Sequence, residues 1–175
     1  MTNSPFSIVE MQPMDRVAVA RLVAKSWIET YVSELGPDIA ARLLDQLDRD
    51  DMTGLLPGAD ETVFLARGRN GLRGCVTSAA RHGITYLWGL YVLQEFQRKG
   101  IGRELVERAV RAHGSKNSVE LTVLKSSVSA RRFYTSLGFQ FASDEDFEIL
   151  PGISLPAEKM GAPASEVVSQ DRPTY

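Results

Sequence analysis

Two segments near the start of the chain carry hydrophobic residues at the three- and four-residue steps of helices. The first begins at Pro13 and ends at Gly36-Pro37, and its expected apolar face holds Val17, Ala20, Ala24, Trp27, Ile28 and Tyr31. The expected apolar stripe of the second is Ile39, Leu43, Leu44 and Leu47. A short strand at Phe6–Met11 precedes them, and glycine and proline mark Asp50–Asp60 as a loop.

The pattern then changes to runs rich in β-branched and aromatic residues, which are typical of strands. Strands are expected at Thr62–Ala66, Leu72–Arg81 and Ile84–Val92. The turn signals Arg69-Asn70-Gly71 and His82-Gly83 separate them, so the three strands are predicted to form consecutive antiparallel hairpins.

Helical spacing returns after a basic turn that follows Val92. The expected elements are a helix from Ile101 to His113, a strand at Ser118–Leu124, a helix at Ser126–Leu137, and extended segments at Phe139–Ala142 and Ile153–Met160. The order β-α-α-β-β-β-α-β-α-β-β predicts an α+β fold, a mixed sheet flanked by about four helices. We expect one domain over residues 6–161 and a polar tail over residues 162–175.

Composition narrows the functional classes. The chain has 175 residues, of which 43% are hydrophobic, enough for one sizeable core. Its formal net charge of −2 disfavours nucleic-acid binding and suits a cationic amine partner. The single cysteine and the two separate histidines predict neither a disulfide nor a metal site. Neither a signal peptide nor an apolar membrane span is evident, so we expect a cytoplasmic protein that does not contact a membrane.

The basic turn carries the clearest chemical signal. It leads from a strand directly into a helix, whose first N–H groups are unpaired and lie at the positive end of the helix dipole. Glycines at 100 and 102 allow an anion to approach the backbone, and Arg98, Lys99 and Arg103 add positive charge. These properties predict a site for a pyrophosphate.

Three nucleotide-binding motifs are alternative interpretations of this turn. A P-loop is excluded because its G-x-x-x-x-G-K-[ST] pattern is absent. A Rossmann fingerprint is disfavoured, since Leu105 stands at its third glycine and Glu120 begins the next strand rather than ending it. The pattern Gln/Arg-x-x-Gly-x-Gly/Ala is matched in full by residues 97–102.

That match resembles the cofactor motif of the GNAT acetyltransferases. A second segment, residues 121–139, is similar to the strand and helix that follow in the family, with Phe133-Tyr134 and Gly138-Phe139 at the usual spacing. The N-terminal helix with Trp27, Thr30 and Tyr31 is also similar to that of many bacterial members of the family. The resemblance spans Phe6 to Met160 and implies a mostly antiparallel sheet whose parallel strands four and five splay apart.

The resemblance implies acetyl-CoA as cofactor. Pantetheine would bond to the backbone of Leu90 and Val92, and the phosphates to the N–H groups of Gln97, Arg98, Lys99, Gly100, Ile101 and Gly102, with Arg103 adding charge. Tyr134 matches the family tyrosine, and its hydroxyl would bind near the sulfur and protonate the departing thiolate. The amine would attack the thioester directly, without a covalent enzyme intermediate.

The sequence also departs from the family. Ser127 stands where an asparagine often contacts the pantetheine arm, Leu93 replaces a common proline, and Tyr86 replaces a catalytic glutamate. The general base is therefore open, with water or Glu29 or Glu34 as candidates. The acceptor-site candidates are Trp27, Glu29, Tyr31, Tyr86 and Trp88, although core packing explains the same aromatic pattern.

These observations favour an N-acetyltransferase that acts on a primary amine of a small molecule or a protein. A non-catalytic acyl-CoA-binding sensor or scaffold is the alternative from another class, and a nicotinamide-dependent oxidoreductase is a third. A homodimer is a possible assembly, as in relatives.

Overall fold

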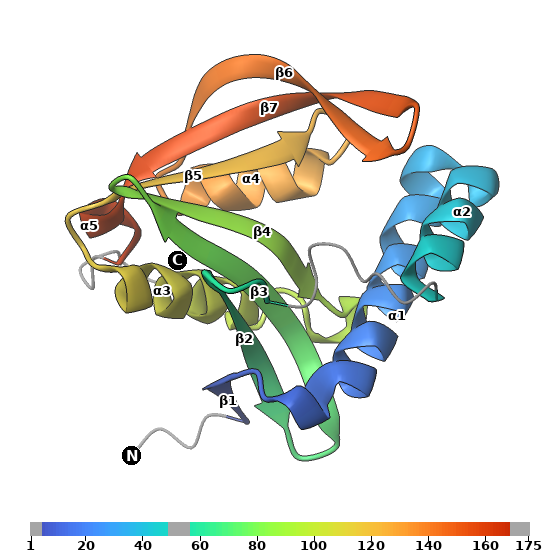
Figure 1. Ribbon diagram of the computed structural model, residues 1–175, viewed down its shortest axis with the longest axis horizontal. Helices are drawn as coiled ribbons and strands as arrows, with labels where there is room; N and C mark the ends of the chain where they lie inside the picture. Colours follow the sequence, from blue (N-terminus) through green and yellow to red (C-terminus); the bar gives the residue numbers. More distant parts are fainter. Residues whose placement is uncertain (1–4, 49–56, 169–175) are drawn as a thin grey trace.

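The computed structural model describes residues 5–48 and 57–168, and a seven-stranded sheet runs through the molecule (Figure 1). Its strand order is β1-β2-β3-β4-β5-β7-β6. The strands are β1 (Phe6–Glu10), β2 (Glu61–Gly68), β3 (Gly71–Arg81), β4 (Ile84–Val92), β5 (Ser118–Leu124), β6 (Gln140–Leu150) and β7 (Ile153–Pro163). All neighbours pair antiparallel except β4 and β5, which are parallel, so the predicted mixed α+β fold is confirmed.

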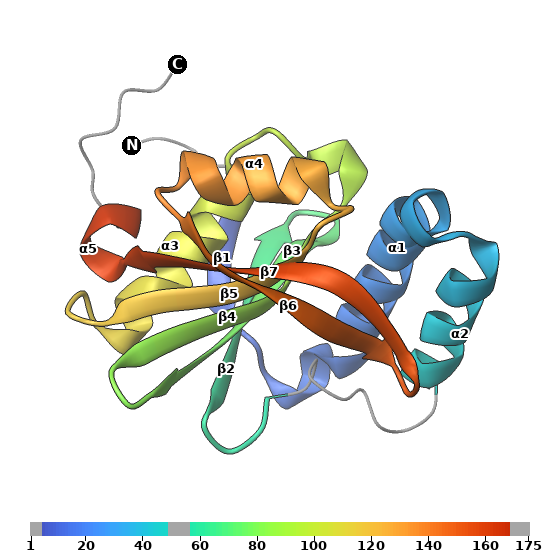
Figure 2. The ribbon, with the colours of Figure 1, turned by 90° about the horizontal axis from the view of Figure 1, so that it is seen from above.

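Helices cover both faces of this sheet (Figure 2). They are α1 (Arg16–Leu35), α2 (Pro37–Asp48), α3 (Ile101–His113), α4 (Val128–Ser136) and α5 (Ala164–Val167), with short 3-10 helices η1 (Pro13–Asp15) and η2 (Gln94–Phe96). None of the helices in the described ranges is both long and apolar enough to cross a membrane.

Two apolar cores result from the period-two alternation of β2 and β3. Phe64 and Val76 point to the face covered by α3, where Leu105 and Val106 are fully buried. Val63 and Cys75 point to the opposite face, where they pack with α1. The sheet therefore separates an α3 side, which also holds the end of α4, from an α1 side.

The buried face of α1 differs from the prediction. Val17 and Ile28 were expected in the core but are 61% and 51% exposed, whereas Val19, Leu22 and Val23 are buried. Apolar residues occur all around this helix, so spacing alone did not select the face that docks on the sheet.

Strands β4 and β5 part after a short stretch of pairing. They pair only from Ile84↔Ser118 to Leu87↔Leu121. Beyond this point β4 continues along β3 to Val92, and β5 continues along β7 to Leu124. We call this opening the fork. It confirms the expected splay of the two parallel strands.

A β-bulge in β4 lies at the fork. Cys75 pairs with Tyr91 but Thr77 pairs with Trp88, so one residue of β3 opposes both Gly89 and Leu90. Gly89 has a φ of 58°, a left-handed value that glycine adopts at no steric cost. The extra residue reverses the alternation, and Leu90 and Val92 consequently pack on the α3 side while Tyr91 packs on the α1 side.

The C-terminal hairpin is longer than predicted. Strand β6 was expected at Phe139–Ala142, but it runs to Leu150 and pairs with β7 along its length. Its charged residues Asp144, Asp146 and Glu148 are exposed, which weakened the strand signal in the sequence. Figures 1 and 2 both show the tip of this hairpin beside α2.

The tail boundary at residue 162 was also placed too early. Strand β7 continues to Pro163, and α5 follows with Ala164 and Val167 0% and 2% exposed. The Ala164 N–H donates to Asn117 O at 3.0 Å, and Arg111 donates to Val168 O at 3.0 Å. Small apolar residues can be buried with little sequence pattern. Residues 169–175, and residues 49–56 of the expected Asp50–Asp60 loop, lie outside the described ranges.

This placement of α5 predicts that Val167→Asp will lower the free energy of unfolding by at least about 3 kcal/mol, because it buries an unpaired charge. Glu166→Gln on the exposed side of the same helix should change it by less than about 0.5 kcal/mol. Urea denaturation of both variants measures the difference. Equal stabilities would show that residues 164–168 are a tail after all.

Candidate functional site

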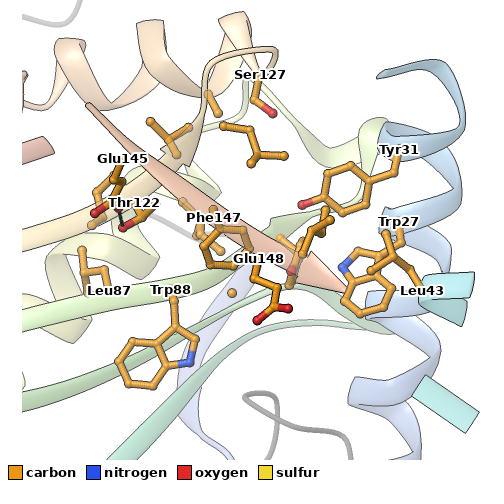
Figure 3. Close-up of a pocket in the computed structure, with 18 of the residues that line it drawn as sticks. Trp27, Tyr31, Leu43, Leu87, Trp88, Thr122, Ser127, Glu145, Phe147 and Glu148 are labelled. Atoms are coloured by element: carbon orange, nitrogen blue, oxygen red, sulfur yellow. Dashed lines mark hydrogen bonds between the residues drawn. The ribbon is translucent and has the colours of Figure 1, made fainter. Parts of the chain in front are cut away.

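The fork opens into a cleft of about 770 Å³. Its walls are the ends of β4 and β5, the start of α4, one side of α1 and α2, and the β6–β7 hairpin (Figure 3). Seven aromatic residues line it: Trp27, Tyr31, Tyr86, Trp88, Tyr91, Tyr134 and Phe147. Its charged lining residues are Glu120, Glu145, Glu148 and Lys159, so carboxylates outnumber cations.

Helix α1 supplies one aromatic wall. The ring of Trp27 lies 6.3 Å from that of Tyr31 and 6.2 Å from that of Tyr91. The indole nitrogen of Trp27 is buried and has no hydrogen-bond partner among the described residues. Figure 3 shows this nitrogen on the side of the ring that faces the cleft, where a ligand could accept from it.

Tyr134 enters the cleft from α4. Its ring packs edge-on against Phe133 at 5.2 Å and Phe139 at 5.7 Å. Burial raises the pKa of Tyr134 above its ordinary value, and the nearby Tyr31 adds to the rise. The hydroxyl therefore stays protonated at neutral pH, as a proton donor must.

The basic turn is tied to α1 and to the end of β4. Glu29 Oε2 accepts from the Gln94 N–H at 2.9 Å, and Lys25 Nζ lies 2.6 Å from Glu95 Oε1. The side chain of Gln97 donates to Val92 O at 2.9 Å. These three contacts fix the turn between the strand and α3.

The backbone of this turn is shaped for an anion. Arg98 and Gly100 have φ values of 60° and 83°, and a left-handed arginine is uncommon enough to point to function. No acceptor within the described ranges takes a hydrogen bond from the N–H groups of residues 98–103, which lead into α3 and form its first residues. We call this row of N–H groups the anion cradle.

Side chains complete the anion cradle. A Cβ on Gly102 would lie 3.1 Å from the Phe133 ring, so the close approach of α3 and α4 here favours glycine. Lys99 Nζ donates to Glu95 O at 2.9 Å, and Arg103 lies 3.8 Å from Glu107. The donor set is cationic and rich in free N–H groups, and it fits phosphate oxygens.

The structure brings most of the predicted acceptor residues together. Trp27, Tyr31, Tyr86 and Trp88 all line the cleft. Glu29 does not line it, since its carboxylate is engaged by the turn at Gln94. Sequence spacing placed Glu29 near the acceptor aromatics but could not show which way its side chain turns.

Two further predicted site residues, Ser127 and Glu34, are hydrogen-bonded to each other. Ser127 lines the cleft, and its hydroxyl donates to Glu34 Oε2 at 2.8 Å, joining α1 to α4. Glu34 therefore lies at the end of the cleft where α4 begins.

Several cleft residues were missed from the sequence. Glu145, Phe147 and Glu148 come from the part of β6 that was not expected, and Figure 3 shows Glu145 beside Thr122. Glu145 accepts a hydrogen bond from the Thr122 hydroxyl. Alternation of charged and apolar residues from Asp146 to Ile149 was the available signal for this strand.

Cys75 is a small core residue, 2% exposed. Burial raises the pKa of its thiol to about 12, so the thiolate needed for nucleophilic catalysis does not form at neutral pH. In the part of the chain that the structure describes, no cluster of three or more His, Cys, Asp or Glu side chains could hold a metal ion.

A fork between parallel strands, followed by an anion cradle at the head of a helix, is the arrangement of an acyl-CoA-dependent transferase fold. Residues 59–141 match the family model described as the acetyltransferase (GNAT) domain. Residues 59–141 are thus a GNAT domain, and the predicted resemblance to the GNAT acetyltransferases is confirmed. No curated protein matches the chain.

Solved structures share the fold over nearly the whole chain. The PaiA N-acetyltransferase of Thermoplasma acidophilum, in complex with coenzyme A, is 20% identical, with 89% of this chain and 97% of that chain covered and a TM-score of 0.68. Spermidine N-acetyltransferase of Vibrio cholerae, in complex with CoA and spermine, is 19% identical, with coverages of 95% and 100% and a TM-score of 0.64. The ribosomal-protein-S18-alanine N-acetyltransferase of Escherichia coli is 16% identical, with coverages of 97% and 99% and a TM-score of 0.64.

Proposed function

We propose that the chain is an N-acetyltransferase that moves an acetyl group from acetyl-CoA to a primary amine in a ternary complex. The fork is the observation that carries this proposal. It joins the anion cradle and Tyr134 to a cleft whose carboxylates and aromatic rings suit a cation.

The residues present fit acetyl-CoA. The anion cradle offers N–H groups and positive charge to the phosphates. Past Leu87 and Leu121 the facing edges of β4 and β5 are no longer hydrogen-bonded to each other. Their backbone groups can therefore pair with the amides of the extended pantetheine arm of CoA. When bound, acetyl-CoA supplies an activated acetyl thioester.

The chain's own residues would then do three things. The backbone of Leu90 and Val92 would align the arm, although one lone pair of Val92 O is already used by Gln97. Ser127 would exchange its bond to Glu34 for one to the arm. The Tyr134 hydroxyl would give its proton to the departing sulfur, with a backbone N–H of β4 polarising the carbonyl.

An amine acceptor is supported by the cleft and by the relatives. Three glutamates face one lysine, so the cleft attracts cations. Two solved structures of this fold are named as acetyltransferases of spermidine and of a ribosomal-protein alanine. A sensor that binds acyl-CoA without turnover would share the anion cradle, but its function would not require a proton donor such as the Tyr134 phenol in the cleft.

The first prediction concerns Tyr134. Tyr134→Phe should lower kcat by about 100-fold or more, because it removes the proton donor, and leave CoA affinity within about threefold. Because the raised pKa of Tyr134 keeps the acid form to higher pH, wild-type kcat should show no alkaline fall below about pH 10. Thiol release from acetyl-CoA with alkylamines, spermidine and alanine-initiated peptides measures both. CoA binding without turnover on any amine would instead favour the sensor.

The second prediction concerns the anion cradle. Arg98→Glu and Lys99→Glu should each weaken CoA binding at least about tenfold, or about 1.4 kcal/mol, because they place negative charge beside the phosphates. The chain's two tryptophans, Trp27 and Trp88, both line the cleft, so their fluorescence reports binding.

The control for this prediction is Lys116→Glu, which makes the same charge change beyond the far end of α3, about 20 Å along the helix. It should leave CoA affinity within about twofold. Unchanged affinity in the Arg98 and Lys99 variants would place the phosphate site elsewhere.

A further inference from the structure

The three cleft carboxylates have different surroundings. Glu145 accepts from the Thr122 hydroxyl, and Glu148 accepts from the Gly152 N–H at 2.8 Å. Glu120 has a charged neighbour, Lys159 Nζ, at 3.9 Å, which is beyond hydrogen-bond distance. No described residue donates a hydrogen bond to Glu120, so its oxygens are available to a ligand in the cleft.

The position of Glu120 relates it to the fork. It pairs with Tyr86, one position before the last β4–β5 pair, Leu87↔Leu121. Its chain neighbours Val119 and Leu121 are buried in the core on the α3 side. Because side chains alternate along a strand, the Glu120 carboxylate faces the α1 side. Its side chain is 27% exposed, so it can exchange a proton with water.

Tyr134 lies across the fork from this carboxylate. It packs against the core on the α3 side, and its chain neighbour Phe133 lies beside Gly102 of the anion cradle. Leu90, where β4 is bulged, is four residues beyond Tyr86, the partner of Glu120, or about 13 Å along the strand. A glutamate side chain, one water and the amine nitrogen in a row span that distance. Proton donor and proton acceptor thus lie on the two sides of the fork.

We propose that Glu120 is the general base that removes the proton of the acceptor ammonium. This role rests on the proposed function. A primary ammonium has a pKa near 10.4, so only about one molecule in a thousand carries a free lone pair at pH 7. A carboxylate with free oxygens beside the fork supplies the missing proton acceptor.

The step balances as follows. The ammonium N–H bond breaks and its proton goes through one water to a Glu120 oxygen. The freed lone pair forms the N–C bond to the thioester carbonyl carbon, and the C–S bond breaks. The sulfur takes the Tyr134 proton, the second amine proton restores the phenol, and Glu120 returns its proton to solvent.

Glu120 shares the cleft with other titratable groups. The other titratable groups that line the cleft are Lys159 on β7, Tyr86 and Tyr91 on β4, Glu145 and Glu148 on β6, Tyr31 on α1 and Tyr134 on α4. Lys159 is the cation among them, and its Nζ lies 3.9 Å from Glu120 Oε2.

The test is the pH profile of kcat/KM for Glu120→Gln, with the best acceptor of the amine panel. Wild type should be flat between about pH 7 and pH 9, because the base makes the amine reactive in the cleft. The variant should be about 1,000-fold slower at pH 7 and gain about tenfold per pH unit, approaching wild type near the pKa of the amine. An unchanged rate at pH 7, or a loss independent of pH, overturns the assignment.

Two comparisons separate catalysis from binding and folding. Tryptophan fluorescence should show CoA bound by the variant as by wild type, and the amine bound within about tenfold. If weaker amine binding accounts for the whole loss, Glu120 only attracts the cation and the assignment is wrong. Glu145→Gln should keep the flat wild-type profile between pH 7 and pH 9, and a slope in that variant instead would transfer the role to Glu145.

The two proposals fail in different ways. A wild-type protein that transfers acetyl to no amine refutes the proposed function. An active wild type with an unaffected Glu120→Gln variant refutes the base alone.

Discussion

The loss of pairing between β4 and β5 is the constraint on which the rest of the site depends. A buried sheet normally satisfies its backbone groups strand by strand, and an opening between two central strands leaves N–H and C=O groups without partners. The bulge at Gly89 and Leu90 turns the end of β4 toward β3, while β7 holds β5 on its other edge. The result is a passage through the sheet that connects its two faces.

Each face contributes a different chemistry to this passage. The α3 side carries the anion cradle and the phenol of Tyr134, and close contact between Gly102 and Phe133 joins α3 to α4 there. The α1 side carries aromatic rings and carboxylates. Because Glu29 and Lys25 hold the turn through Gln94 and Glu95, α1 also sets the position of the anion cradle. A helix that lines the acceptor cleft therefore helps to position the donor site.

The half of the site that would bind the acetyl donor was predicted well from the sequence, because it depends on local chemistry. Glycine spacing, basic residues and a strand-to-helix boundary are all visible within residues 92–103, and the hairpin turns fixed the order of β2, β3 and β4. The acceptor half depends on long-range packing. The docking face of α1, the length of β6 and the direction of Glu29 follow from contacts between segments far apart in the chain, which spacing does not record. Glu120 was seen only as an argument against a dinucleotide site, because its pairing with Tyr86 appears only in the folded sheet.

A crystal structure of the protein with bound CoA is the most direct test of this account. We expect the pantetheine arm between β4 and β5, the pyrophosphate on the N–H groups of residues 98–103, and the sulfur beside the Tyr134 hydroxyl. CoA bound outside the fork, or with its phosphates away from residues 98–103, would contradict the account.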